Sequence, residues 1–449
     1  MELNDQLRRA LNEAGLTRRA SGQPPALALR PQPGDLPPAR VNRADPAVPD
    51  ELGIEGFLPG FWQDTPAGRV FVVERRYELD YRHGGYTLGS LLDVPPPILA
   101  QIGRHDGLSG IDHRQIVYLD TETTGLAGGT GTLAFLVGIG HFLDGHFRLR
   151  QYFLDSLEGE EALLRALSDY LERFSAVASF NGKVFDVPLL ETRFILSRLR
   201  KDVRALPHLD LLFAARRMYR DRFESCRLGE IERRVLGLTR PDDVPSFEVP
   251  SLYFRYVRYR RFRALLPVFH HNALDILSLV TLAAHLGGLY GGTIALDNED
   301  ELALARVCEQ EGRITDAIAH YRAILRQEPP PLRRDDAERR LSLIYKRSGR
   351  WQEATQIWER SAGRPENCSI FPHVELAMFC EQQQRSFDAA LGHAEHALAL
   401  LRRHHLRLGA NGARQQELLL ERRLTRLQKR IERPKRAQTR AILAPTPQG

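Results

Sequence analysis

The sequence predicts an α/β domain, with a mixed sheet flanked by helices, followed by an all-α domain of helical repeats. Three observations support this division of the 449 residues. Apolar strand-like runs in the centre of the chain lead into alternating helical and strand-like segments. The last third is helical in pattern almost throughout, and similar segments recur within it. A chain of this length is also long enough for two or three domains, each with its own core.

The first 110 residues precede the predicted α/β domain and fall into two parts. Residues 1–50 are rich in Pro, Arg and Ala, a composition typical of disordered or linker segments. Residues 51–110 are more apolar and contain a predicted strand at 69–77. We expect residues 51–110 to form a small β segment that packs on the domain that follows.

Residues 111–292 form the predicted α/β domain. Strand-like runs come first, and the dipeptide Asp144-Gly145 joins two of them as a hairpin. Acidic residues at Glu160 favour the start of a helix. The expected elements are strands at 115–119, 132–142 and 147–154, a helix at 160–174, a strand at 176–180 and a helix at 187–199. This order favours a mixed sheet.

Residues 300–405 form the predicted repeat domain. A small residue recurs in three similar segments, as Ala317, Ala354 and Ala389, at separations of 37 and 35 residues. These separations are close to the tetratricopeptide period of about 34 residues. A small residue at this position allows two helices to pack closely. We therefore expect about three tetratricopeptide-like helix hairpins, and we expect them to bind a protein partner.

Residues 406–449 form a basic tail. From residue 401 to the end there are 13 Lys and Arg against 3 Glu, a net charge of +10, within a formal net charge of +6 for the whole chain. Such a tail suits phosphate backbones, because neutralising phosphates releases counterions. A solvated helix face followed by a disordered end explains the same residues, so both interpretations stay open.

Several sequence features bear on the compartment. The four cysteines show neither a zinc-site spacing nor a disulfide framework, which indicates a reducing compartment. The N-terminus lacks the basic-then-apolar order of a signal peptide. No uninterrupted apolar run reaches the roughly 18 residues that span a bilayer, and residues 276–292 come closest. We expect a cytoplasmic protein with no membrane partner.

Carboxylates recur at three places in the α/β region. Asp120 and Glu122 are two residues apart on a strand, so their side chains point to the same face. Asp186 follows the turn dipeptide Asn181-Gly182, and Asp275 lies within a helical pattern. The order Asp, Glu, Asp, Asp is more informative than any one of these residues alone.

Two histidines precede the last carboxylate. His271 stands four residues before Asp275 and therefore on the same helix face. His270 stands five residues before it, rotated by about 100°. Spacing favours His271 as the partner of Asp275, although a bend just before Asp275 would exchange the two histidines.

Clustered carboxylates are costly unless cations neutralise them. Oxygen ligands of this kind suit Mg²⁺ or Mn²⁺ rather than zinc. Two such ions about 3.5–4 Å apart form the clamp that serves in-line displacement at phosphorus. A histidine that titrates near neutral pH can accept the proton of the attacking water. The residues therefore predict phosphodiester hydrolysis with two Mg²⁺ or Mn²⁺ ions.

Three motifs resemble those of the DEDD family of RNase H-like 3′→5′ exonucleases, in particular its bacterial YprB-like subgroup. They are Asp120-Thr-Glu-Thr-Thr-Gly125, Asn181-Gly-Lys-Val-Phe-Asp186 and His271-Asn-Ala-Leu-Asp275. The resemblance extends over residues 65–290 and implies an RNase H-like fold. It also implies Asp120, Glu122, Asp186 and Asp275 as metal ligands and a His or Tyr as general base. The family places a His base five residues before the last Asp and a Tyr base four before, and this chain has a His at both positions.

Further residues are candidates for substrate contacts. Thr123 would support the strand end or contact the 3′ nucleotide, and Asn181 and Lys183 belong to the second motif. Lys183 is either a phosphate contact or a solvated turn lysine. Residues 252–263 interleave arginines with aromatic residues, a pattern that suits single-stranded nucleic acid. An amphipathic helix with buried aromatics and solvated arginines would show the same pattern.

The sequence thus predicts a metal-dependent 3′→5′ exonuclease acting on single-stranded DNA or RNA. Two alternatives remain. One is a catalytically silent nucleic-acid-binding scaffold that recruits partners through its helical repeats, and the other is a structure-specific endonuclease. Retention of all four carboxylates argues against the scaffold, and an end-blocked substrate would separate exonuclease from endonuclease action.

Overall fold

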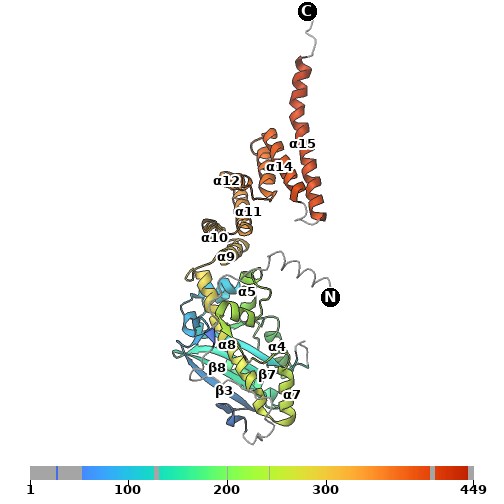
Figure 1. The fold of residues 1–449 in the computed structure, drawn as a ribbon. Coiled ribbons are helices and arrows are strands. Elements are labelled where there is room, and N and C mark those ends of the chain that lie inside the picture. The colour runs from blue at the N-terminus through green and yellow to red at the C-terminus, as the bar shows by residue number, and fades with distance from the viewer. Residues whose placement is uncertain are drawn as a thin grey trace, which may run out of the picture. The chain divides into compact units, whose positions relative to one another are not determined.

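The computed structural model describes residues 27–28, 53–125, 131–199, 201–241, 243–404 and 410–442. The chain divides into two compact units, Met1–Ala295 and Leu296–Gly449 (Figure 1). Apart from residues 27–28, the N-terminal segment predicted to be disordered lies outside the described residues.

A seven-stranded mixed sheet forms the centre of the first unit, with strand order β10-β9-β6-β7-β8-β3-β2. β6 is antiparallel to β7 and parallel to β9, and β9 is parallel to β10. The mixed sheet predicted from the sequence is confirmed. The strands are β2 Gly60–Thr65, β3 Gly68–Glu78, β6 Ile116–Thr123, β7 Ala134–Leu143, β8 His146–Phe153, β9 Ala176–Ser179 and β10 His208–Asp210.

The segment at 51–110 differs from the expected packing. The predicted strand at 69–77 lies within β3, but β3 pairs with β8 along eight residues and so extends the central sheet. Local sequence cannot show this pairing, because β8 lies more than 65 residues further along the chain. The segment is therefore part of the sheet, with β2 at its edge.

The hairpin between β7 and β8 is formed as predicted. Asp144 and Gly145 have φ angles of 49° and 77°. Positive φ at both central residues is the type I′ turn, whose twist matches that of the strands it joins. This turn fixes the register of β7 against β8, in which Gly138 lies opposite Gln151. On its other side β7 pairs with β6, and there Gly138 lies opposite Asp120.

Helices cover both faces of the sheet. On one face α8 packs against β6 and β7, because Gly138 and Gly140 leave room for Asn272 and Ile276 (Figure 1). On the other face lies α3, where His141 Nε2 is 2.8 Å from the Tyr170 hydroxyl. The helices are α2 Pro96–Gly103, α3 Glu160–Leu171, α4 Asp186–Leu196, α5 Leu211–Tyr219, α6 Leu228–Ile231, α7 Val249–Tyr259 and α8 Leu266–Gly291.

Short elements complete this unit. Two-stranded pairs form between β1 Leu27–Ala28 and β11 Leu238–Thr239, and between β4 Arg82–His83 and β5 Tyr86–Thr87. The 3₁₀ helices are η1 Ile54–Gly56, η2 Leu88–Leu91, η3 Asp106–Leu108, η4 His113–Gln115, η5 Leu157–Gly159 and η7 Phe262–Leu265, and η6 Glu232–Leu236 is a π-helix.

α8 is a long, apolar helix. With η7 it forms a segment, Phe262–Gly291, that is long and apolar enough by composition to cross a membrane. However, 83% of its most apolar window is buried inside the fold. That burial is what a central helix requires when it packs on a sheet.

The second unit consists of helices. They are α9 Asn298–Gln310, α10 Ile314–Arg326, α11 Pro331–Arg347, α12 Trp351–Ala362, α13 Phe371–Gln382, α14 Phe387–His404 and α15 Ala410–Ile442. Ala317 and Ala354 are buried at the predicted small positions, but in the third repeat the buried residue is Ala390 and Ala389 is exposed. The reason is that α14 begins at Phe387, three residues before Ala390, just as α12 begins at Trp351, three residues before Ala354.

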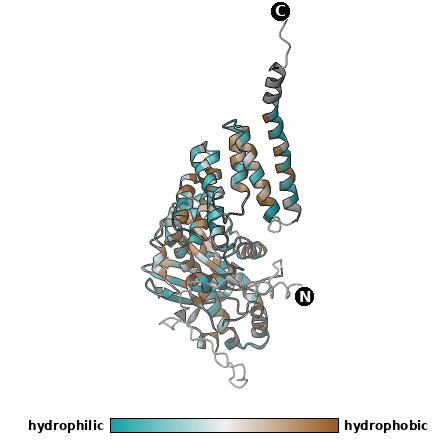
Figure 2. Cartoon of the chain, turned by 45° about the horizontal axis from the view of Figure 1, so that its top comes forward, coloured by the Kyte–Doolittle hydropathy of each residue, from teal (hydrophilic) through white to brown (hydrophobic). Residues whose placement is uncertain are grey.

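The basic tail is largely a helix. α15 packs on α13 and α14 through Leu420 and Leu427, which are buried beside Leu401 and Ala394. Its described arginines are mostly on the solvent side, and Figure 2 shows α15 as mainly hydrophilic with hydrophobic residues at intervals. The helix-face interpretation of these residues therefore holds for their described part.

Candidate active site

Strand β6 carries the first two carboxylates toward α8. Asp120 accepts a hydrogen bond from Asn272 Nδ2, at 2.8 Å to Oδ2. Glu122 Oε1 lies 3.9 Å from His271 Nε2. Since Asn272 and His271 both belong to α8, Asp120 and Glu122 face the same helix, as alternation along a strand requires.

Helix α8 contributes the next two groups. His271 Nε2 lies 3.5 Å from Asp275 Oδ2, one turn further along the helix. His270 instead lies near His83, whose pKa is lowered to about 3 by burial, by Arg240 and by the charge of His270. Of the two histidines, the structure therefore brings His271 together with Glu122 and Asp275.

Asp186 approaches the strand from another direction. It is the first residue of α4 and is buried, and the Thr121 hydroxyl donates to its Oδ1. Thr121 stands between Asp120 and Glu122, so its side chain points to the opposite face of β6. Asp186 nevertheless lies close enough that its charge raises the pKa of both Asp120 and Glu122.

The turn before Asp186 is held by a buried carboxylate. Asp210 accepts hydrogen bonds from the backbone N–H groups of Asn181 (2.8 Å) and Lys183 (3.0 Å). His208 Nε2 lies 2.7 Å from the Ser179 hydroxyl. His208 and Asp210 therefore hold this turn in place.

The predicted substrate contacts lie in different surroundings. The Thr123 hydroxyl donates to the Gly125 carbonyl at 2.8 Å, which supports the end of the strand. The Lys183 side chain is exposed, and that of Asn181 is half-buried. All three belong to the same end of the sheet as Asp120, and their contact with substrate stays a prediction.

The arginine-rich segment at 252–263 begins within α7, and its aromatic residues differ in burial. Tyr253 and Tyr256 are buried against the core, whereas Phe254 and Tyr259 are 49% and 57% exposed. Arg255 and Arg258 are exposed on the same helix. The buried aromatics fit the amphipathic-helix interpretation, and the exposed ones leave a surface of the kind that stacks with bases.

Arg240 and Asp243 belong to the site although sequence reasoning missed them. The Arg240 guanidinium pairs with Asp275 Oδ1 at 2.6 Å and also with Glu232. Asp243 Oδ1 lies 2.6 Å from His271 Nδ1. No spacing rule links these residues to α8, which begins more than twenty residues later. Asn272, by contrast, could have been predicted from the sequence, since it lies inside the third motif.

The carboxylates carry an electrostatic cost. Burial raises the pKa of Asp120 well above its usual range, and Asp275, Asp186 and Glu122 raise it further. Burial is also the main cause that raises the pKa of Glu122 to about 8 and that of Asp186 to about 6. Burial opposes the charge of His271, but Asp275 and the hydrogen bond to Asp243 outweigh it and raise its pKa to about 10.

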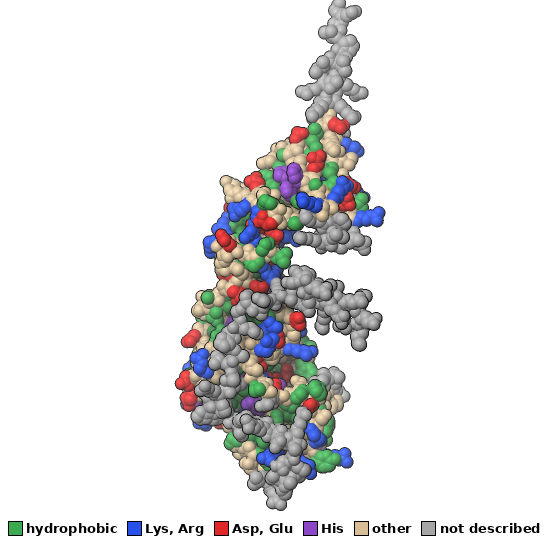
Figure 3. Space-filling model, viewed as in Figure 1, with side chains coloured by type: hydrophobic (Ala, Val, Ile, Leu, Met, Phe, Trp, Pro, Cys, Tyr) green, Lys and Arg blue, Asp and Glu red, His purple; other side chains and the backbone are tan. Residues whose placement is uncertain are grey.

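This arrangement attracts cations. Among the described residues, no three His, Cys, Asp or Glu side chains surround one point as ligands of a single ion, and Arg240 and His271 supply the nearby positive charge. The donor set still fits Mg²⁺ or Mn²⁺, because it consists of largely buried carboxylate oxygens whose charges raise the pKa values of Asp120 and Glu122. In the space-filling view, acidic side chains lie inside a hollow of the first unit (Figure 3).

Gly138 is expected to be essential for seating α8 against Asp120. A Cβ at this position would lie 2.2 Å from Asn272 Oδ1, and Asn272 also accepts from Gln151 Nε2 at 2.9 Å. We expect Gly138→Ala to lower the free energy of unfolding by about 1–3 kcal/mol, as overpacking does in a core. Denaturant unfolding measures this loss. Gly110→Ala is the control, since a Cβ there meets no atom within 4 Å, and equal stability of the two variants would contradict the expectation.

Comparison with known proteins defines the class. Residues 117–287 match the family model of the RNase H superfamily, a span that begins in β6 and ends in α8 and so includes all four carboxylates. The chain is also 30% identical over 358 residues to the uncharacterised protein YprB of Bacillus subtilis (strain 168), covering 78% of this chain and 84% of that protein. The chain belongs to the YprB family of RNase H-like proteins. This membership indicates a nuclease-type hydrolase that binds nucleic acid, and RNase H-like nucleases generally use divalent metals.

Proposed function

We propose that this protein is a divalent-metal-dependent 3′→5′ exonuclease that acts on single-stranded nucleic acid. The observation that carries the proposal is the meeting of Asp120 and Glu122 with His271 and Asp275 on the α8 side of β6. Asp186 adds its charge from the start of α4. The order of these residues along the chain resembles that of the DEDD exonucleases, which supports the narrower assignment.

Asp120, Glu122, Asp186 and Asp275 would hold two Mg²⁺ or Mn²⁺ ions. When bound, such ions lower the pKa of a water molecule and stabilise the leaving oxygen of a phosphodiester. Within the protein, Asn272 orients the Asp120 carboxylate and Thr121 orients that of Asp186. The turn held by Asp210 fixes the position from which α4 presents Asp186.

His271 is the proposed general base. When Nδ1–H donates to Asp243, Nε2 is left as the acceptor that faces Glu122 and Asp275. The two carboxylates are among the causes that raise the pKa of His271. Their neutralisation would lower this pKa toward the range in which a neutral imidazole takes a proton from water.

A comparison of linear and circular single strands tests the direction of attack. The purified protein is incubated with Mg²⁺ or Mn²⁺ and 5′-labelled DNA or RNA, with a free or a blocked 3′ end, and with a circular strand. We expect the free 3′ end to give a ladder that shortens from that end, and the other two substrates to persist. Cleavage of the circle would instead establish an endonuclease on the same fold.

One observation favours a catalytically silent nucleic-acid-binding domain as the second candidate. Arg240 pairs with Asp275, and its guanidinium already neutralises part of the carboxylate cluster. In a domain that only binds nucleic acid, the charge of Arg240 would be enough to stabilise the carboxylates without a metal ion. Binding of oligonucleotides without cleavage at any divalent ion tested would favour this candidate over the exonuclease.

Metal binding should stabilise the protein more at high pH than at low pH. The pKa values of Glu122 and Asp186 are raised, so the folded state holds protons that the unfolded state has lost, and stability falls as pH rises from about 4 to 8. A divalent ion replaces those protons, and at 100 times its Kd it contributes about 2.7 kcal/mol. Thermal unfolding at pH 5.5 and 8, with and without Mg²⁺, measures the effect.

The Asp120→Asn protein is the control for this experiment, since it lacks one of the proposed ligands. We expect its Mg²⁺-dependent shift in Tm to be much smaller at pH 8. Equal shifts at both pH values, or in both proteins, would argue that the ion binds elsewhere.

The protein is proposed to be cytoplasmic, as its sequence predicts.

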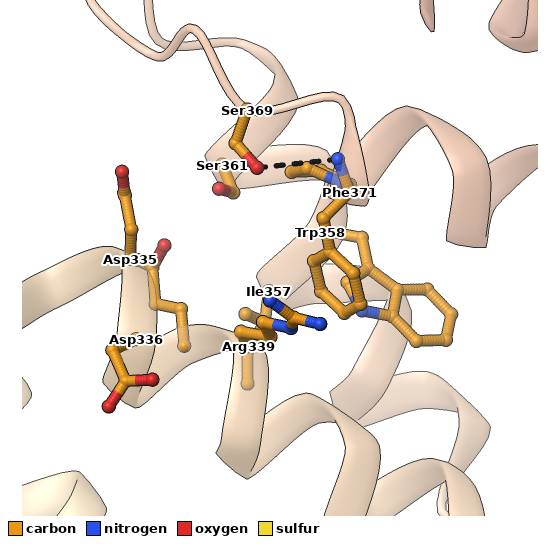
Figure 4. A pocket seen from close by; sticks show the side chains of 10 residues that line it. Asp335, Asp336, Arg339, Ile357, Trp358, Ser361, Ser369 and Phe371 are labelled. Carbon is orange, nitrogen blue, oxygen red and sulfur yellow. Dashed lines mark hydrogen bonds between the residues drawn. The ribbon is translucent and has the colours of Figure 1, made fainter. Parts of the chain in front are cut away.

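The helical unit is proposed to bind a protein partner. A groove of about 840 Å³ runs beside α11, α13 and α15, and Leu332 on its edge is 82% exposed. A smaller pocket of about 210 Å³ adjoins it, with Asp335 and Asp336 on one side and Trp358 and Phe371 on the other (Figure 4). These cavities support the predicted partner site, and the arginines of α15 support the proposed affinity of the tail for phosphates.

A further inference from the structure

A groove of about 730 Å³ opens at the carboxyl ends of β9 and β10, apart from the carboxylates themselves. Its lining includes Phe180 and Asn181 after β9, and residues of α5 and of the loop that follows it, among them Arg216, Arg220, Phe223 and Arg227. In open α/β sheets, ligands bind at the carboxyl ends of parallel strands. The position of this groove therefore makes it a candidate binding site.

The groove and the carboxylate cluster lie at the ends of neighbouring strands. β9 lies beside β6, and their register pairs Tyr118 with Ala178. Asp120 and Phe180 therefore follow at the same level of two strands that are about 4.8 Å apart. A polymer bound in the groove could thus continue to the carboxylates across a single strand.

The charges of the groove are available to a ligand. Arg216 and Arg227 are exposed, and neither side chain forms an ion pair with another residue in the part of the chain that the structure describes. Arg220 is paired only loosely, at 3.7 Å from Asp221. Glu224 is the acidic residue of the lining, so the three arginines leave the groove positive.

The apolar part of the lining suits sugars and bases. Phe180 is half-buried beside Asn181, and Phe223 stacks on Tyr219 with ring centroids 5.2 Å apart. Exposed arginines combined with aromatic surface are what a single strand requires, whereas the bases of a duplex are stacked and leave no face free for an aromatic side chain. The volume is in the range that holds a small ligand, and hence one or two nucleotides.

We infer that this groove, here called the β9–β10 groove, binds the sugar–phosphate backbone of the single strand that leads into the active site. The inference rests on the proposed exonuclease function, in which the 3′-terminal nucleotide lies at the carboxylates. The groove then holds nucleotides on the 5′ side of the bond that is cleaved. Arg216 and Arg227 contact phosphates there, whereas a dinucleotide without a 5′ phosphate carries no phosphate other than the one that is cleaved.

Binding without cleavage tests the groove independently of catalysis. In the absence of divalent metal, fluorescence anisotropy follows a labelled single strand of about 12 nucleotides binding to the full-length protein. We expect the Arg216→Gln/Arg227→Gln double variant to bind about tenfold more weakly, and the slope of log K against log salt to become shallower by about 1.4, the value for two lost phosphate contacts. Arg69→Gln/Arg76→Gln is the control for the loss of two positive charges, since it removes two exposed arginines from β3 near the other edge of the sheet.

An unchanged affinity of the groove variant overturns the inference, and so does an equal loss in the control, which would reflect net charge alone. If the wild-type protein cleaves, the groove variant should raise KM for the long strand with kcat unchanged, and leave a dinucleotide unaffected. If the wild type cleaves nothing, the binding result still decides the groove. Failure of the proposed function and failure of this inference are therefore distinguishable.

A second measurement needs no substitution. Cys226 lies in the lining of the groove and is partly exposed, while Cys368 is partly exposed in the helical unit. Alkylation at pH 8.5, read by peptide mass spectrometry, follows both thiols with and without the single strand. We expect the strand to slow alkylation of Cys226 severalfold, and by more than it slows alkylation of Cys368, which lies beside arginines of α15. Equal protection of both thiols, or of neither, contradicts a strand in the groove.

Discussion

Replacing Asp120 with asparagine should abolish cleavage, with a loss on the order of 10³-fold or more, because a metal-binding carboxylate stabilises charge in the transition state. The substitution keeps the shape of the side chain and an oxygen that can accept from Asn272 Nδ2. The fold should therefore persist. Initial rates on a 5′-labelled single strand with saturating Mg²⁺ or Mn²⁺ measure the loss.

The same substitution should make the metal-free protein more stable at pH 8. The pKa of Asp120 is raised by burial and by three neighbouring carboxylates, so its ionised form is disfavoured in the folded state. Asp169→Asn is the matched control, since Asp169 is exposed on α3, and neither its activity nor its stability should change. Full activity of the Asp120→Asn protein would refute the proposed site.

Replacing His271 with glutamine should reduce kcat by about 10²–10⁴-fold, the usual contribution of a general base. Nε2 of His271 faces Glu122 and Asp275, and Asp243 holds the other ring nitrogen. His270→Gln is the matched control one residue away, and its kcat should fall by less than about tenfold. The pH profile of kcat gives a second readout, because loss of the base should remove the limb of the profile that falls toward acidic pH.

The opposite result is equally informative. A larger loss in the His270 variant would mean that α8 bends before Asp275 when substrate and metal bind, so that the two histidines exchange. The spacing in the sequence leaves this exchange open. The structure favours His271, because it places His271 beside Glu122 and Asp275 and places His270 near His83.

Much of the site was predictable because it is local in sequence. Asp120 and Glu122 share a face since they are two residues apart on β6, and His271 meets Asp275 because four residues make one turn of α8. The hairpin at Asp144-Gly145 was predictable for the same reason, since two residues with positive φ define its turn. The mixed sheet followed from the order of strands and helices.

Other features depend on residues that are distant in sequence. The pairing of β3 with β8 made residues 51–110 part of the central sheet, and no local pattern specifies a partner strand so far away. The third repeat shows a smaller error of this kind. Two adjacent alanines offered two registers, and only the start of α14 at Phe387 determined that Ala390 is the buried one.

The sequence by itself determined the chemical groups of this protein: four carboxylates in a fixed order, two adjacent histidines, and a helical C-terminal region. The spacing of residues within one strand or one turn of helix also predicts which of these groups share a face. Only the tertiary structure decided which side chains from other segments contact the carboxylates and His271. Arg240 and Asp243 reach Asp275 and His271 only through packing of the segment after β11 against α8. Likewise, the β9–β10 groove exists because parallel pairing brings the ends of β6, β9 and β10 to one edge of the sheet.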